Sequence, residues 1–170
     1  EGEGEPLILL HGLFGALSNF KDLIEHFRKS YKVVVPMLPL FELDIFHTTV
    51  GGFEKYVQKF IELKEYENIH LLGNSLGGHV ALVHVLKHPK KIKSLILTGS
   101  SGLFESGMGD SYPKRGNYEY IKTKTELTFF NPATATKELV DEVFEITNNR
   151  LKVIKILALA KSCLLYTSPS

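Results

Sequence analysis

Residues Ile69 to Gly78 read Ile-His-Leu-Leu-Gly-Asn-Ser-Leu-Gly-Gly, and this stretch decides the fold. Its centre is a G-x-S-x-G motif around Ser75. The apolar run that precedes the motif predicts a buried strand, and the segment from Leu76 to Lys87, rich in Val, Leu and Ala, predicts a helix. The G-x-S-x-G pattern alone is not specific, but here it lies at a sharp turn between a predicted strand and a predicted helix, which makes it informative.

The glycines of this stretch predict a turn that is too tight for side chains. Gly73 and Gly77 leave room for it, so Ser75 is expected in a strained backbone conformation with its hydroxyl group pointing out of the sheet. An ordinary glycine turn does not explain Gly78, which would let the helix pack closely against the strand. We therefore interpret the segment as a nucleophile elbow, with Ser75 as the catalytic nucleophile.

A second informative stretch lies upstream, where the apolar run Leu7 to Leu10 is followed by His-Gly-Leu-Phe-Gly. In acyl transfer, backbone N–H groups stabilise the negative oxygen of the tetrahedral intermediate. One donor is expected from Leu76, the residue after the nucleophile, and the other from a loop after a neighbouring strand. We predict the N–H group of Leu13 as this second donor, with Phe14 as the alternative.

These two stretches, in their order and spacing, resemble the α/β-hydrolase superfamily. The resemblance covers about residues 6–161 and is specific for the fold but much less so for the substrate. It implies an α/β fold with a doubly wound parallel sheet and the start of a helical cap insertion, the C-terminal part of the core being absent. The motif residues that it implies as structural are His11, Gly12, Gly73, Gly77 and Gly78.

The segments around the motifs predict alternating strands and helices. Asn19 is expected to cap a helix through Phe27, and Tyr31 to Val35 reads as a strand. An amphipathic helix is predicted over Gly52 to Lys64, and Ile92 to Thr98 reads as another strand. This alternation predicts a parallel sheet with right-handed crossovers, whose ligands bind beyond the carboxyl ends of the strands, where both motifs lie.

The chain changes character after Gly99. Helices are predicted over residues 118–130, 135–148 and 150–161. We therefore expect three parts: residues 1–103 as the N-terminal part of the core, 104–161 as the cap, and 162–170 as an off-pattern tail, interpreted as an artefact of sequence read-through. Candidate substrate contacts are Phe14, Phe104, Phe129 and Phe130, although plain packing is the alternative explanation for each.

A serine hydroxyl needs a histidine base and an orienting acid, which follow the nucleophile in this fold. All seven histidines lie at or before residue 88: His11, His26, His47, His70, His79, His84 and His88. His11 precedes Ser75 and is predicted to be a hydrogen-bonded loop residue, and His79 is only one helical turn beyond Ser75. Glu105 and Asp110 read as solvated loop charges. We therefore assign no catalytic histidine or acid in this chain.

The length of the chain agrees with the absence of a catalytic histidine and acid. Domains of this type commonly run to roughly 250 residues, and the chain has 170. We expect an incomplete gene product that has lost the last strands with the acid and the base. Such a polypeptide is expected to fold poorly and to catalyse little.

Composition sets bounds. A net charge of +1 gives no signature of nucleic-acid binding, and the lysines at 87, 90, 91 and 93 are interpreted as a solvated face. No apolar run reaches the roughly 20 residues of a membrane helix. Cys163 is the only cysteine, so a reducing, cytoplasmic setting is the default expectation. No cofactor and no metal-ligand spacing is predicted, and the oligomeric state stays open.

The leading interpretation is a serine hydrolase that acts on an ester or a related acyl or carbon–carbon bond of a small molecule, with an apolar or aromatic acyl part. A thioesterase, a lipase-like enzyme or a cofactor-free peroxidase would use the same elbow. A non-catalytic binding or scaffold protein is the alternative from another class.

Overall fold

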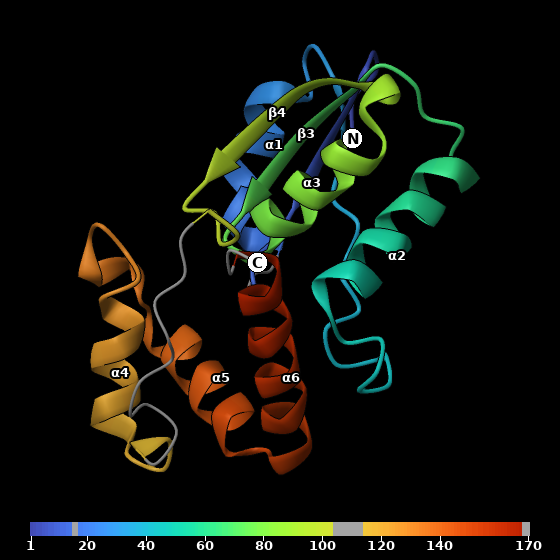
Figure 1. Cartoon of the computed structure of the whole chain (residues 1–170). Helices are drawn as coiled ribbons and strands as arrows, with labels where there is room; N and C mark the ends of the chain where they lie inside the picture. Colours follow the sequence, from blue (N-terminus) through green and yellow to red (C-terminus); the bar gives the residue numbers. More distant parts are fainter. Residues whose placement is uncertain (15–16, 104–113, 168–170) are drawn as a thin grey trace. The chain divides into compact units, whose positions relative to one another are not determined.

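The computed structural model describes residues 1–14, 17–103 and 114–167. The chain divides into two compact units (Figure 1). The first comprises Glu1–Glu105 together with Ala158–Ser170, and the second comprises Ser106–Leu157.

The first unit is built on a four-stranded parallel sheet with the strand order β2-β1-β3-β4. Its strands are β1 (Pro6–Leu10), β2 (Lys32–Val34), β3 (Ile69–Asn74) and β4 (Ile92–Thr98). All pairings are parallel, as the predicted doubly wound sheet requires. The chain leaves β1 toward one edge of the sheet and returns at β3 to build the other. The carboxyl ends of β1 and β3 therefore flank the switch point of the sheet, where ligands bind in such folds.

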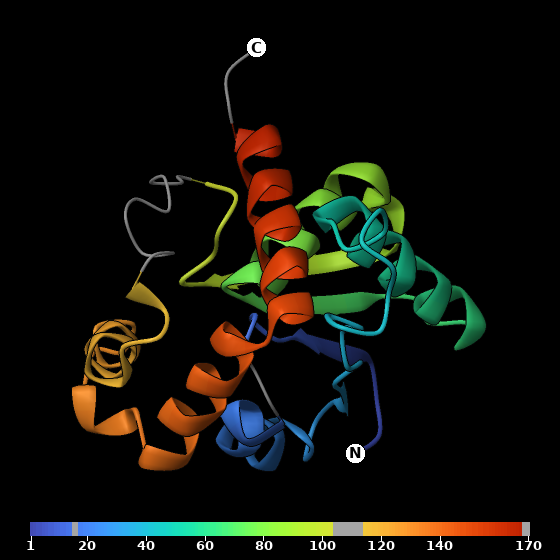
Figure 2. The ribbon, with the colours of Figure 1, turned by 90° about the horizontal axis from the view of Figure 1, so that it is seen from below.

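Helices cover both faces of this sheet (Figure 2), namely α1 (Lys21–Phe27) on one face, and α2 (Val50–Leu63) and α3 (Leu76–Lys87) on the other. Side chains of β1 point alternately to the two faces. Ile8 and Leu10 pack in the core with α2 and α3, and Leu7 and Leu9 pack in the core beside α1. The hydrophobic core is thus two layers with β1 and β3 between them, which fixes the positions of the segments that follow these strands.

The predicted helix over Gly52 to Lys64 is confirmed, but it begins at Val50. Thr49 accounts for the earlier start, because its hydroxyl oxygen accepts a hydrogen bond of 3.0 Å from the N–H group of Gly52. The prediction for Asn19 is wrong: this residue lies inside the 3-10 helix η1 (Leu17–Phe20), and α1 begins after Phe20 without a side-chain cap.

Thr49→Ala is expected to lower the free energy of unfolding by ~1 kcal/mol, because it removes the acceptor for an N–H group in the first turn of α2. Chemical denaturation of the purified chain measures this. Thr49→Ser keeps the hydroxyl and should stay close to the parent. Equal losses of stability in both variants would show that the methyl group of Thr49, and not its hydroxyl, accounts for the loss.

The described part of the second unit is helical. It contains α4 (Tyr118–Glu126), the 3-10 helix η4 (Pro132–Thr134) and α5 (Lys137–Asn148), which Thr136 caps. The helix predicted over 118–130 therefore ends four residues early. Tyr118 ties α4 to α5: its hydroxyl donates a hydrogen bond of 2.6 Å to Asp141, and its ring meets Phe144 edge-on.

The last helix, α6 (Arg150–Thr167), starts in the second unit and ends in the first. It passes its predicted end at residue 161 because the following residues have partners in the first unit. Ser162 is 7% exposed and its hydroxyl accepts a hydrogen bond of 3.1 Å from the N–H group of Val50. Leu159 and Cys163 pack in the core on the α2 side of the sheet. The structure therefore makes Ser162 and Cys163 part of the fold, although the sequence pattern sets them apart.

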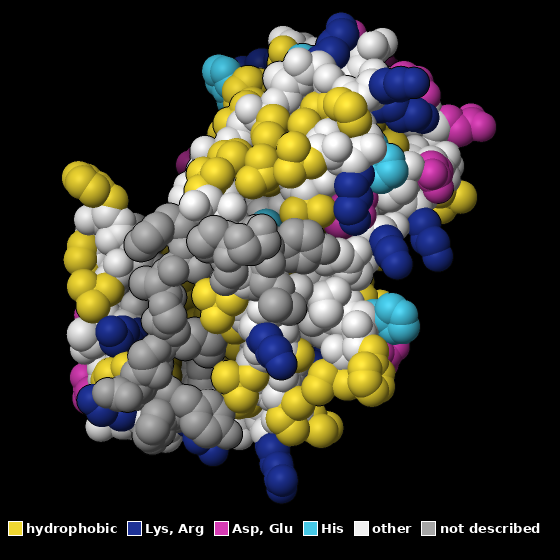
Figure 3. All heavy atoms as spheres, in the orientation of Figure 1, with side chains coloured by type: hydrophobic (Ala, Val, Ile, Leu, Met, Phe, Trp, Pro, Cys, Tyr) yellow, Lys and Arg dark blue, Asp and Glu magenta, His cyan; other side chains and the backbone are white. Residues whose placement is uncertain are grey.

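Strand β4 is an edge of the sheet. None of its seven residues is fully buried, and Ile96 is 44% exposed. Hydrophobic side chains gather over this strand on the face that Figure 3 shows. The short helix η2 (Pro89–Lys91) leads into it from α3. Among the described helices, none combines the length and the apolar character that crossing a bilayer requires.

The lysines around η2 were expected to form a solvated face, but three of them also form ion pairs. Lys87 pairs with Glu54, Lys91 with Glu67 and Lys93 with Glu5. These ion pairs tie the end of α3 and the start of β4 to α2, to the loop before β3 and to the residue before β1. Three of these four lysines are thus paired with a carboxylate.

Candidate functional site

Ser75 forms the turn between β3 and α3, with φ of 52° and ψ of −119°. Few side-chain-bearing residues adopt this backbone conformation. Hydrogen bonds hold its backbone on both sides. The N–H group of Ser75 donates a hydrogen bond of 3.1 Å to the carbonyl oxygen of Thr98. The carbonyl oxygen of Ser75 accepts hydrogen bonds from the N–H groups of Gly78 at 3.0 Å and Ser101 at 3.1 Å. Ser75 is exposed. The end of β4 and the start of α3 thus hold a strained serine at the surface.

The glycines around Ser75 are required by close backbone contacts. A Cβ atom on Gly77 would overlap the backbone carbonyl of Leu10, and one on Gly73 would lie 2.5 Å from the carbonyl oxygen of Gly77. A Cβ atom on Gly78 would overlap Ser100, in the segment after β4. The expected tight packing is therefore present, with one difference: Gly78 makes room for Ser100 as well as for β3.

The loop after β1 lies against Ser75. A Cβ atom built on Gly12 would be 3.1 Å from the Cβ atom of Ser75. Leu13 and Phe14, the two candidates for the second oxyanion donor, follow in a turn and are half-buried. Leu76 is the first residue of α3, so its N–H group has no acceptor within the helix. The structure thus brings the loop with both candidate donors next to the serine, at the switch point of the sheet.

His11 is buried and engaged by the backbone at both ring nitrogens. Its Nε2 accepts a hydrogen bond of 2.9 Å from the N–H group of Leu38, and its Nδ1 lies 2.8 Å from the carbonyl oxygen of Gly12. The Nδ1 atom therefore carries the proton and donates it to Gly12. This arrangement fixes the loop after β1 and matches the predicted structural role of His11.

The remaining predicted substrate contacts lie outside the described part of the first unit. Phe129 is half-buried and Phe130 fully exposed, and both belong to the second unit. Phe104 lies outside the described residues, as do Glu105 and Asp110. In the described part of the chain, the Ser75 hydroxyl forms no hydrogen bond with a histidine. Substrate contacts by the three phenylalanines stay a prediction.

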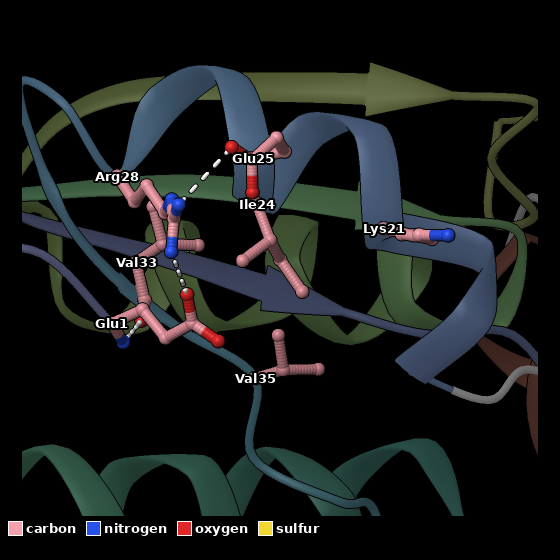
Figure 4. Close-up of a pocket in the computed structure, with 7 residues that line it drawn as sticks. All are labelled: Glu1, Lys21, Ile24, Glu25, Arg28, Val33 and Val35. Atoms are coloured by element: carbon pink, nitrogen blue, oxygen red, sulfur yellow. Dashed lines mark hydrogen bonds and ion pairs between the residues drawn. The ribbon is translucent and has the colours of Figure 1, made fainter.

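A depression elsewhere on the first unit is lined by α1, β2 and the first residue of the chain (Figure 4). Its Arg28 is held at 3.1 Å by both Glu1 and Glu25. The guanidinium group is thus neutralised, and the lining includes no residue of the elbow or of the loop after β1. This depression is not part of the candidate site.

A buried ionic cluster joins α2 to α3. Glu54 on α2 is 2% exposed and contacts His84, Lys87 and His88. Burial by itself would raise the pKa of Glu54, but the hydrogen bonds and charges of Lys87 and His84 outweigh it, so this pKa lies below its usual value. Burial lowers the pKa of His84 despite the neighbouring carboxylate. Its imidazole is therefore neutral near pH 7.

The sequence analysis did not single out this cluster. The spacing of His84 and His88, one helical turn apart, was the available signal. Glu54 lies thirty residues upstream, and only the packing of α2 on α3 brings its carboxylate to the pair.

Comparison with known proteins identifies the family. The family model described as "alpha/beta hydrolase fold" matches residues 5–129. The curated relatives include Lipase 1 of Psychrobacter immobilis, 30% identical over 64% of this chain and 35% of the lipase. They also include a 2-hydroxy-6-oxononadienedioate/2-hydroxy-6-oxononatrienedioate hydrolase of Comamonas testosteroni, 30% identical over 82% of this chain and 55% of the hydrolase.

The solved structures agree. MGS-MChE2, an alpha/beta hydrolase enzyme from a sediment metagenome of the Mar Chica lagoon, is 40% identical with a TM-score of 0.75. The match covers 98% of this chain and 61% of that enzyme. The chain spans between 28% and 57% of the length of the curated relatives compared with it.

Proposed function

The chain belongs to the alpha/beta hydrolase fold family, and on that premise we propose that Ser75 is the nucleophile of a serine hydrolase. The observation that carries the proposal is the backbone of Ser75, held at φ of 52° at the carboxyl end of β3 and exposed. Strain of this kind persists only where the surrounding structure enforces it, and it concentrates at functional sites. In the proposed reaction on an ester, the Ser75 Oγ atom attacks the carbonyl, the ester C–O bond breaks, and the serine proton passes by way of a base to the departing alcohol. Water then hydrolyses the acyl-serine, which releases the acid and restores the hydroxyl.

The N–H groups of Leu76 and Leu13 would hold the oxyanion, with Phe14 as the alternative to Leu13. Support comes from the position of Leu76 at the first turn of α3, where N–H groups point outward and favour negative charge. The close approach of Gly12 to Ser75 supports a donor from the same loop. Both donors are backbone groups, so the apolar side chains at 13 and 76 do not conflict with this role.

The proposed substrate is a small-molecule ester or a related compound with an acyl or carbon–carbon bond to cleave. Two relatives support these bond types: one is named as a lipase and the other as a hydrolase of a 2-hydroxy-6-oxo dienedioate. A serine at position 75 also favours acyl chemistry over reactions that need a carboxylate nucleophile at the elbow. An apolar or aromatic acyl part remains a proposal from the aromatic residues Phe14, Phe129 and Phe130.

We also propose that residues 1–170 by themselves hydrolyse esters poorly. Within the described ranges, five of the seven histidines have polar partners other than Ser75. His11 contacts the backbone, His84 and His88 contact Glu54, His70 contacts Glu5 and Ser94, and His47 contacts Asp44. A serine without a base stays a weak nucleophile.

A fluorophosphonate probe tests both proposals, because it labels only an activated serine. A longer product of the same gene, read beyond Ser170, is expected to be labelled at Ser75, and the 170-residue chain only marginally. Mass spectrometry of the labelled peptide identifies the residue. A folded longer product that stays unlabelled would favour a binding protein instead. Equal labelling rates in both chains would disprove the proposed inactivity of the shorter one.

A further inference from the structure

The cluster of Glu54, His84 and His88 brings three side chains with metal-binding atoms to one place in the first unit. Their ligand atoms, one carboxylate oxygen and two imidazole nitrogens, all lie within 4.8 Å of one another. The cluster plays no part in the proposed reaction. Two imidazoles and a carboxylate are a donor set typical of zinc sites in proteins.

Two of the three separations within the cluster match the edges of a tetrahedral site. The Oε1 atom of Glu54 lies 3.2 Å from His84 Nδ1 and 3.3 Å from His88 Nε2. Four-coordinate zinc, with bonds of about 2.0–2.1 Å, places its ligand atoms ~3.3 Å apart. An ion can therefore replace these two contacts, and the two imidazole nitrogens, which lie within 4.8 Å of each other, complete the third edge.

The surroundings provide a rigid support and an entry path. Glu54 and His84 are 2% and 1% exposed, so packing fixes their positions. His88, at the end of α3, is 37% exposed, which gives an ion access from solvent. The second oxygen of Glu54 is held by Lys87 at 2.7 Å, so only Oε1 is available to an ion. The charge of Lys87 opposes a cation, and this repulsion limits the affinity of the site.

We propose that Glu54 Oε1, His84 Nδ1 and His88 Nε2 bind one divalent transition-metal ion of the zinc type, with water as the fourth ligand. Both imidazoles coordinate in their neutral form, and each carries its proton on the other ring nitrogen. The ion would link α2 to the end of α3. In this way the site adds stability to the helical layer that supports the elbow.

Titration of the chain, carrying no added histidines, with Co²⁺ and Zn²⁺ tests the proposal. We expect one ion per chain, with the visible absorption of four-coordinate Co²⁺, displaced by Zn²⁺. His88→Ala removes one of the three proposed ligands and should weaken binding at least ~100-fold. Losing a residue that only hydrogen-bonds to a metal ligand already weakens binding by up to about 100-fold. His26→Ala removes an exposed histidine outside the cluster and should bind as the parent does.

Thermal unfolding gives a second readout, since an ion that binds only the folded chain raises the midpoint. Zn²⁺ should raise the midpoint of the parent and of His26→Ala, but not of His88→Ala. Binding that is equal in His88→Ala and the parent would overturn the proposal, as would the absence of saturable binding to the folded parent. The cluster would then be only a buried hydrogen-bonded ion pair.

Discussion

Ser75→Ala is expected to abolish ester hydrolysis by the longer gene product, with a loss in kcat of about 10⁴- to 10⁶-fold. The substitution removes the atom that would form the acyl intermediate, and the oxyanion donors alone leave only a small residual rate. The release of a chromophoric alcohol from short- and medium-chain esters measures the loss. The pre-steady-state burst that an acyl-enzyme produces should disappear with it.

Ser94→Ala is the matched control. This serine lies on β4 and pairs with His70 near the beginning of β3, at the opposite end of the strand from the elbow. Ser94→Ala also removes one serine hydroxyl group, but far from the elbow, and should keep the activity of the parent. Substantial hydrolysis by Ser75→Ala, with the fold intact by circular dichroism, would exclude Ser75 as the nucleophile.

Gly77→Ala is expected to destabilise the chain by at least ~3 kcal/mol, at the upper end for overpacking substitutions. The added Cβ atom would overlap the carbonyl group of Leu10, and it would lie 2.7 Å from the carbonyl oxygen of His11. Both obstacles are backbone, so no side chain can rotate away. Either β1 or α3 must shift, which opens the core beneath the elbow. Denaturant unfolding, or the yield of soluble chain if it does not fold, measures the effect.

Two other glycines provide a graded comparison for this loss. Among the described residues, a Cβ atom built on Gly116 would meet only the Asn148 side chain, at 4.0 Å, so Gly116→Ala should change stability by less than ~1 kcal/mol. Gly99 has open space around it but φ of +50°, and Gly99→Ala should cost ~1 kcal/mol from backbone strain alone. A loss in Gly77→Ala no larger than in Gly99→Ala would show that overlap with Leu10 does not require the glycine.

The elements around the elbow could be predicted because several local signals agree there. The apolar runs of β1 and β3, the glycines at 73 and 77 and the helix from Leu76 all require the same turn. The sequence predicts less well where tertiary contacts decide. The start of α2 depends on the cap by Thr49, and the continuation of α6 depends on the hydrogen bond between Ser162 and Val50.

The same distinction between local signals and tertiary contacts applies to the candidate site. The position of Ser75 follows from its immediate neighbours in the chain, and so does the loop that holds Gly12. The cluster around Glu54 could not be predicted, because its carboxylate and its histidines meet only through the packing of α2 on α3. The aromatic residues Phe129 and Phe130 belong to a different unit, and no local pattern relates them to the serine.

The exposed edge of β4 has a practical consequence for each of these measurements. A strand with open backbone groups on one side and half-covered apolar side chains is a template for any extended peptide that meets it. In a purified sample of the 170-residue chain, the most abundant such peptide is another molecule of the same chain. Protein concentration therefore becomes an experimental variable, and unfolding curves and metal titrations should be repeated over a dilution series. Agreement across the series would identify the response as that of a single molecule.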